Sequence, residues 1–178
     1  MSLIYLTSVG RIEEGLLEIL ESQLADVFGL RVGCLKPLPE PSYAFDPKRR
    51  QYSSVAVMHE LMRVCPASGA RLLGITEKDL FIPVLSFVFG QAQLNGSLSV
   101  VSLARLHQEF YQFAPDQPLL QERALKEAMH ELGHTFGLVH CPEKACPMSL
   151  ATNIHQLDLK KTDWCVSCEI LLQEAISR

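Results

Sequence analysis

Residues 130–140 constrain the fold of this chain most strongly, because they combine three histidines with two glycines in the order His-Glu-Leu-Gly-His-Thr-Phe-Gly-Leu-Val-His. His130 and His134 lie four residues apart, so in a helix their imidazoles sit one turn apart on one face and can bind one metal ion. Gly137 can adopt the positive φ that ends the helix, and His140 can return as a third ligand. Three protein ligands leave the fourth position of zinc open to water, as hydrolytic zinc requires. A chance arrangement of polar residues on a helix does not explain the extension to the last histidine.

The helix that carries this motif is expected over residues 117–136, with Pro118 in the first turn, where proline is tolerated. Its apolar side chains recur on one side, and the opposite side carries His130 and His134 together with two glutamates, Glu127 and Glu131. The apolar set is Leu125, Ala128, Met129, Leu132 and Phe136. Glu131 is displaced around the helix from the ligands, so it can reach an activated water without binding the metal. We therefore predict Glu131 as the general base.

Four cysteines form a second pattern, Cys141-x4-Cys146 followed by Cys165-x2-Cys168. Paired cysteines at such spacings are typical of a structural zinc site, in which four thiolates leave no open position. Two disulfides, or thiols without a shared role, are the alternatives; the absence of an export signal favours metal. Because the first cysteine directly follows His140, a zinc ion here would fasten the loop that presents the third histidine.

The remaining cysteines and histidines are expected to have structural roles. Cys34 and Cys65 are interpreted as ordinary buried thiols. His59 and His107 are interpreted as structural residues, whereas His155 lies between the cysteine pairs and is a weaker candidate for a role near the cleft.

Upstream of the motif, apolar runs alternate with amphipathic segments in the order typical of an α/β chain. Strands are expected at residues 3–9, 30–36, 71–75, 84–89 and 98–103, helices at 13–28 and 51–64, and a loop at 40–50. Downstream the chain becomes rich in Cys, Pro and His, and a final short helix is expected at 169–177. The predicted fold is α/β (α+β), with a mixed twisted sheet, an active-site helix and a small cysteine-rich C-terminal subdomain.

The composition disfavours some classes of partner. The formal net charge of −4 provides no basic surface for phosphates, so nucleic-acid binding is not expected. The apolar run at residues 3–9 is too short for a membrane span and lacks the basic lead-in of a secretory signal. We therefore expect a cytoplasmic monomer without membrane association.

Residues 130–168 resemble the archaemetzincins, a branch of the metzincin clan of zinc peptidases. The resemblance is carried by His130-Glu131-x-x-His134-x-x-Gly137-x-x-His140-Cys141, by Cys146-x-Met148 and by Cys165-x-x-Cys168. It implies that the three histidines bind a catalytic zinc, that Glu131 is the general base, and that the four cysteines bind a structural zinc. Two zinc ions per chain are thus expected.

The resemblance also implies a metzincin-like architecture. Residues 1–137 would form an upper subdomain that ends at the zinc-binding helix, and residues 138–178 a small lower one. Met148 would form the turn beneath the catalytic site. The strand above the cleft would be residues 84–91.

The predicted activity is hydrolysis of peptide bonds by a zinc-activated water, with a peptide or protein substrate extended along a sheet edge. A zinc hydrolase of a non-peptide amide would carry the same motif and is one alternative. The other is a non-catalytic two-zinc interaction module. The open three-histidine site with an adjacent glutamate argues against that module.

Overall fold

Five strands form the main sheet of the computed structural model, which describes residues 3–66 and 69–177. Their order is β2-β1-β5-β8-β7, and every neighbouring pair is parallel except β7 with β8. The strands are β1 (Leu3–Ser8), β2 (Arg31–Cys34), β5 (Ala70–Thr76), β7 (Gly90–Ala92) and β8 (Leu98–Ser102). The mixed sheet expected from the sequence is confirmed.

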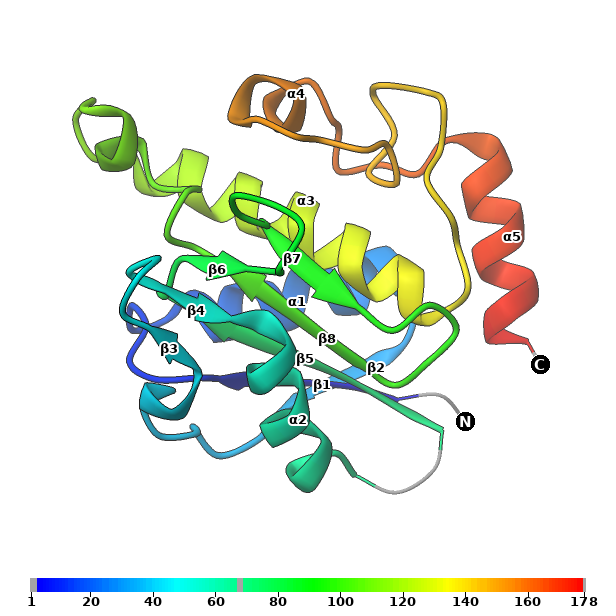
Figure 1. Cartoon of the computed structure of the whole chain (residues 1–178). Helices are drawn as coiled ribbons and strands as arrows, with labels where there is room; N and C mark the ends of the chain where they lie inside the picture. The colour runs from blue at the N-terminus through cyan, green and yellow to red at the C-terminus, as the bar shows by residue number, and fades with distance from the viewer. Residues whose placement is uncertain (1–2, 67–68, 178) are drawn as a thin grey trace.

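Helices cover both faces of this sheet (Figure 1). The helices α1 (Leu16–Phe28) and α3 (Gln117–Thr135) pack on one face, and α2 (Ser54–Val64) packs on the other. Alternation along the strands explains the division, since successive side chains of a strand point to opposite faces. Ile4 and Leu6 join the core with α1 and α3, whereas Tyr5 between them contacts the core with α2.

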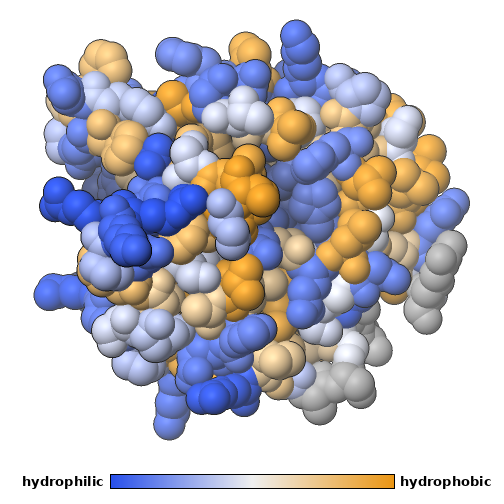
Figure 2. Space-filling view, in the orientation of Figure 1, coloured by the Kyte–Doolittle hydropathy of each residue, from blue (hydrophilic) through white to orange (hydrophobic). Residues whose placement is uncertain are grey.

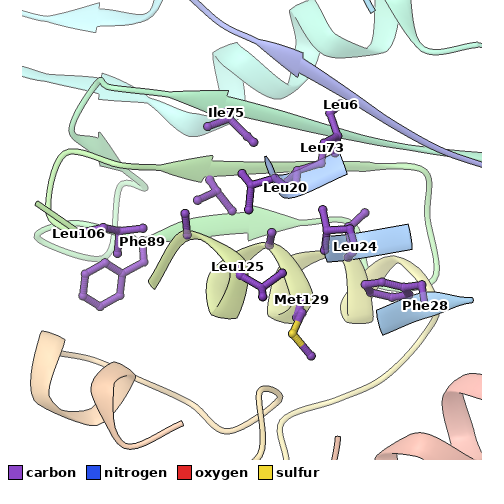
Figure 3. Packing of buried hydrophobic residues seen from close by; sticks show 14 of the residues in the cluster. Leu6, Leu20, Leu24, Phe28, Leu73, Ile75, Phe89, Leu106, Leu125 and Met129 are labelled. Atoms are coloured by element: carbon purple, nitrogen blue, oxygen red, sulfur yellow. The ribbon is translucent and has the colours of Figure 1, made fainter. Parts of the chain in front are cut away.

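The first of these cores holds α3 against the sheet. Figure 3 shows side chains from β1, α1, β5 and α3 converging between the helices and the sheet. At one end, the ring of Phe28 lies 5.6 Å from that of Phe136 and 5.5 Å from that of Trp164, measured between centroids. One side chain of α1 therefore contacts both the end of α3 and the C-terminal part of the chain.

The segment expected to form the strand above the cleft is a loop for most of its length, so that prediction is wrong for residues 84–89. The edge strand is β7, and before it only Val88 makes an isolated bridge, to Leu80. Side chains take the place of a strand ladder here: Arg49 donates to the carbonyls of Pro83 and Leu85, and Gln51 donates to the carbonyl of Ser86. With its carbonyls bound in this way, the segment needs no neighbouring strand.

A small second sheet also departs from the expectations. The strands β3 (Phe45–Asp46), β4 (Gln51–Ser53) and β6 (Leu80–Phe81) pair in that order, beside the short helix η1 (Ser42–Ala44). The predicted loop at 40–50 thus contains structure. The helix expected from residue 51 begins at Ser54, because the Ser53 hydroxyl caps it by accepting from the Ala56 amide.

The chain beyond α3 lies across that helix from the sheet (Figure 1). It contains α4 (Ile154–Asp158) and α5 (Val166–Ile176), while the short helix η2 (Gln108–Tyr111) precedes α3. Arg123 of α3 fastens α4 with two 2.7 Å bonds to the Asp158 carboxylate and donates to the Leu106 carbonyl at 2.8 Å. Covered on both sides, α3 is buried around its whole circumference from Arg123 to Gly133. No helix in the described part of the chain is long and apolar enough to cross a membrane.

Truncation of Phe28 to alanine should lower the free energy of unfolding by about 3–5 kcal/mol, as for other large buried side chains. Urea denaturation of the zinc-replete protein measures the change. Phe113→Ala is the matched control, because Phe113 is 64% exposed and its truncation should cost less than about 0.5 kcal/mol. Equal losses in the two variants would contradict the role given to Phe28.

Candidate metal centre

The three histidines of the motif converge at the end of α3. Their ligand atoms lie within 4.8 Å of one another, and the Nε2 atoms of His130 and His134 are 3.2 Å apart. His140 reaches them from the segment after the helix, its ring 5.3 Å from that of His130 and 5.0 Å from that of His134. The structure thus brings together the three residues that the sequence singled out.

Backbone carbonyls orient two of these rings. The Nδ1 of His130 is 2.8 Å from the Pro147 carbonyl, and the Nδ1 of His134 is 2.8 Å from the Leu138 carbonyl. Each carbonyl accepts from Nδ1–H, which leaves the lone pair of Nε2 for a metal. Burial lowers the pKa of His130 well below its usual value, and the nearby charge of Lys160 lowers it further. Both effects favour the neutral imidazole that metals bind.

The turn after α3 explains how His140 returns to the site. Gly137 has a φ of 92°, a conformation that favours glycine. Its amide donates to the His134 carbonyl and the Leu138 amide donates to the Gly133 carbonyl, the two bonds of a Schellman motif. The Asn95 amide, from the turn between β7 and β8, donates to the same His134 carbonyl at 2.8 Å. The helix end is therefore fixed by its own backbone and by the sheet.

Met148 lies directly against the helix between the two histidines. A Cβ atom added to Gly133 would collide with the Met148 sulfur and lie 3.6 Å from the Trp164 ring. Met148 is completely buried. The absence of a side chain at Gly133 therefore lets the methionine pack beneath the ligand pair.

Glu131 lies on the side of the site that faces the sheet edge. A Cβ atom on Gly90 of β7 would stand 2.6 Å from Glu131 Oε1 and 2.7 Å from the Val100 carbonyl, so the glycine is required for this approach. Burial raises the pKa of Glu131 well above its usual value, and the charge of Glu127, one helical turn earlier, raises it further.

A cavity of about 380 Å³ connects these groups. Its walls are the loop before β7, β7 itself, the ligand face of α3 and residues 150–152. Glu131 and the three histidines line it, as do Glu127 and Lys160. On the face seen in Figure 2, hydrophobic residues form several small groups among hydrophilic ones. Val84 of the loop before β7 is 83% exposed.

The four cysteines form a separate cluster, with all sulfur atoms within 4.8 Å of one another. The sulfurs of Cys141 and Cys165 are 3.8 Å apart, far beyond the roughly 2.05 Å of a disulfide. Ligand bonds of about 2.3 Å to a tetrahedral zinc set sulfurs about 3.8 Å apart. The cluster can therefore hold one zinc ion with four thiolates.

The other residues considered from the sequence lie outside both clusters. His107 pairs with Glu77 at 2.8 Å, while His59 and His155 are exposed and do not line the cavity. Cys34 is exposed and its thiol is 3.4 Å from Glu21 Oε2, so the expectation of a buried thiol is wrong there. The residue that sequence reasoning missed is Lys160, which is buried in the cavity although nothing in its local sequence distinguishes it from Lys161.

The geometry agrees with two comparisons to known proteins. The profile of peptidase family M54 matches residues 44–174. The archaemetzincin of Methanocaldococcus jannaschii is 39% identical over 166 residues, spanning 93% of this chain and 90% of that relative. The chain belongs to the archaemetzincin family.

Solved structures share the fold along nearly their whole length. The zinc-dependent peptidase of Methanocorpusculum labreanum has a TM-score of 0.88 at 32% identity, covering 95% of this chain and 99% of that one. The archaemetzincin of Methanopyrus kandleri has a TM-score of 0.85 at 37% identity, covering 100% and 96%. The metzincin-like fold predicted from residues 130–168 is confirmed.

Membership of the archaemetzincins makes the chain a zinc metallopeptidase that acts on peptides or proteins. The enzyme class expected from the motif is confirmed. A non-catalytic two-zinc module does not fit this membership.

Gly133→Ala should destabilise the fold by about 1–3 kcal/mol, the usual cost of overpacking, and weaken zinc binding at the histidines by displacing Met148. Thermal unfolding and competition with a chelator measure the two effects. In the control, Gly33→Ala, the new methyl group meets only the Tyr5 ring at 3.9 Å, so neither quantity should change. Zinc affinity equal to that of the wild type in Gly133→Ala would contradict the packing role.

Proposed function

We propose that this archaemetzincin hydrolyses peptide bonds at the site formed by His130, His134 and His140, with Glu131 as the general base. The observation that carries the proposal is the convergence of three imidazoles and one buried carboxyl group on a single cavity beside a sheet edge, with the Nε2 atoms of His130 and His134 left free by their backbone bonds.

The three histidines would hold the catalytic zinc, and His130 and His134 would do so through the Nε2 atoms that their backbone bonds leave free. When bound, zinc supplies a Lewis acid that activates water near neutral pH and polarises the scissile carbonyl. Glu131 accepts the proton of that water and passes it to the leaving amine.

The substrate would bind along β7. This strand is at the edge of the sheet, hydrogen-bonded to β8 on one side, and all three of its residues, Gly90, Gln91 and Ala92, line the cavity on the other. An extended peptide can add to such an edge through main-chain hydrogen bonds. The scissile bond would then lie between the edge strand and the histidines.

The cysteine cluster would hold a second, structural zinc, giving two zinc ions per chain. The Cys141 amide donates to the Met148 carbonyl at 2.9 Å, so the cluster is bonded directly to the turn beneath the catalytic site. Four thiolates leave no open position, and this ion would stabilise the loop that carries His140 without taking part in the reaction. We further infer a division at residue 137 between an upper subdomain with the sheet and a lower one with this zinc, and a monomeric, cytoplasmic enzyme.

Glu131→Gln should reduce turnover of a validated peptide substrate by about 10²-fold or more while both zinc ions stay bound, because the amide keeps the shape but cannot accept the proton. A diverse peptide library read by mass spectrometry provides the substrate, and elemental analysis gives the zinc content. Glu174→Gln is the control, since Glu174 is exposed on α5 and lies outside the cavity. Turnover near that of the wild type in Glu131→Gln would remove this residue from the role of base.

Cys168→Ser should release one of two zinc ions, lower the unfolding temperature and weaken binding of the remaining ion, since the loop with His140 loses its support. Cys34→Ser, which alters a thiol outside the cluster, should change none of these. Thiol titration of the denatured wild type distinguishes metal from disulfides. Four fewer free thiols without reduction, together with zinc content unchanged by Cys168→Ser, would show that the cysteines do not bind metal.

A further inference from the structure

Lys160 is a buried cation in the wall of the catalytic cavity. It follows α4, where its amide donates to the Leu157 carbonyl at 3.1 Å, and the residue is only 2% exposed. Its side chain lines the same cavity as the histidines and Glu131. The proposed hydrolysis assigns no role to Lys160.

The hydrogen-bonding capacity of this ammonium group is largely unused. Its contacts are Glu127 Oε1 and His130 Nδ1, both at 3.4 Å from Nζ. The second is not an acceptor, because that nitrogen donates its proton to the Pro147 carbonyl at 2.8 Å. Among the described residues, the three N–H donors of this ammonium group therefore have one acceptor, Glu127 Oε1, at 3.4 Å.

Lys126 shows how an equally buried lysine of this chain is satisfied. Its Nζ lies 2.6 Å from Glu122 Oε1 and 3.3 Å from the Asp158 carbonyl. A buried ammonium costs several kcal/mol unless close partners replace its water. Among the residues that the structure describes, Lys160 has no partner as close as that of Lys126, and Lys160 borders the cavity.

We propose that Lys160 binds a carboxylate of the substrate, on the residue that contributes the leaving amine. This inference rests on the proposed function, in which Glu131 delivers a proton to that amine. Of the two contacts of Lys160, Glu127 lies one helical turn before Glu131 and His130 directly precedes it, so the lysine lies close to Glu131. Carboxylates are the anions that an unmodified peptide offers, and an ammonium group in a poorly hydrated cavity binds them by short charge-assisted bonds.

Two parts of a peptide can supply this carboxylate. One is the side chain of an aspartate or glutamate directly after the scissile bond, which would make the enzyme an acid-selective endopeptidase. The other is the C-terminal carboxylate of a last residue in that position, which would make it a carboxypeptidase. In both cases Lys160 sets specificity, and its ammonium group binds the substrate carboxylate and Glu127 at the same time.

Binding to the zinc-loaded Glu131→Gln protein tests the proposal without turnover. Calorimetry compares an acetylated, amidated Ala-Ala-Asp-Ala peptide with its Asn counterpart, and acetylated Ala-Ala-Leu with its C-terminal amide. We expect one carboxylate peptide to bind about tenfold or more tightly than its neutral partner. The pair that shows the preference identifies the source of the carboxylate.

Variants of the lysine assign the preference to its charge. Adding Lys160→Met should abolish the preference, and Lys160→Arg should retain it. The control, Lys161→Met, alters the adjacent exposed lysine and should leave it unchanged. Zinc content and unfolding temperature show whether each protein is folded. Should Lys160→Met not fold, Glu127→Gln gives the answer, because removing the competing carboxylate should increase the preference.

The outcomes separate this inference from the proposed function. If the wild type hydrolyses peptides but neither peptide pair shows a carboxylate preference, the role of Lys160 is overturned and the proposed hydrolysis stands. The same holds if a preference is seen but survives Lys160→Met. A preference unchanged by Glu127→Gln likewise overturns the role of Lys160 when that variant is the one used. A lysine-dependent preference in the Glu131→Gln protein, when the wild type cleaves no library peptide, supports the binding site and overturns the proposed hydrolysis.

Discussion

Three consecutive residues after α3 connect the two candidate metal sites of this protein. The sulfur of Cys146 belongs to the cysteine cluster, the carbonyl of Pro147 orients His130, and the Met148 sulfur packs against Gly133. This turn is bonded in addition to Cys141, the neighbour of His140. The orientation of His130 and the segment that carries His140 therefore both depend on this turn. A carbonyl acceptor fixes the tautomer of its imidazole only as well as the carbonyl itself is fixed.

The sequence was most informative where one local rule decides the structure. Histidines four residues apart face the same metal ion when the segment is a helix, and Gly137 takes a φ that few other residues adopt. The helix, its end and the return of His140 therefore follow from residues 130–140. The cysteine cluster was predictable for a similar reason, since paired thiols at short spacing have few other uses.

Interactions between distant segments account for what was missed. Residues 84–89 are apolar enough to suggest a strand, but Arg49 and Gln51 bind their carbonyls from more than thirty residues away. The burial of Lys160 likewise depends on how the chain after α3 covers that helix. The lysine is adjacent to the exposed Lys161, and no local pattern indicates which of the two is buried. Periodicity within a segment carries no information on such coverage.

The chain between Cys146 and Cys165 determines how the substrate preference of this enzyme can differ from that of its relatives. After Pro147 and Met148, which support the histidine site, residues 149–164 contain α4, the cavity wall at 150–152 and Lys160, and the three histidines and four cysteines of the candidate sites all lie outside this loop. A loop closed at both ends loses little additional free energy when it lengthens, because closure entropy grows only with the logarithm of length. Insertions and substitutions in this loop can therefore reshape the cavity while the ligands of both sites stay in place. Differences in substrate preference between relatives should accordingly concentrate between the two cysteine pairs.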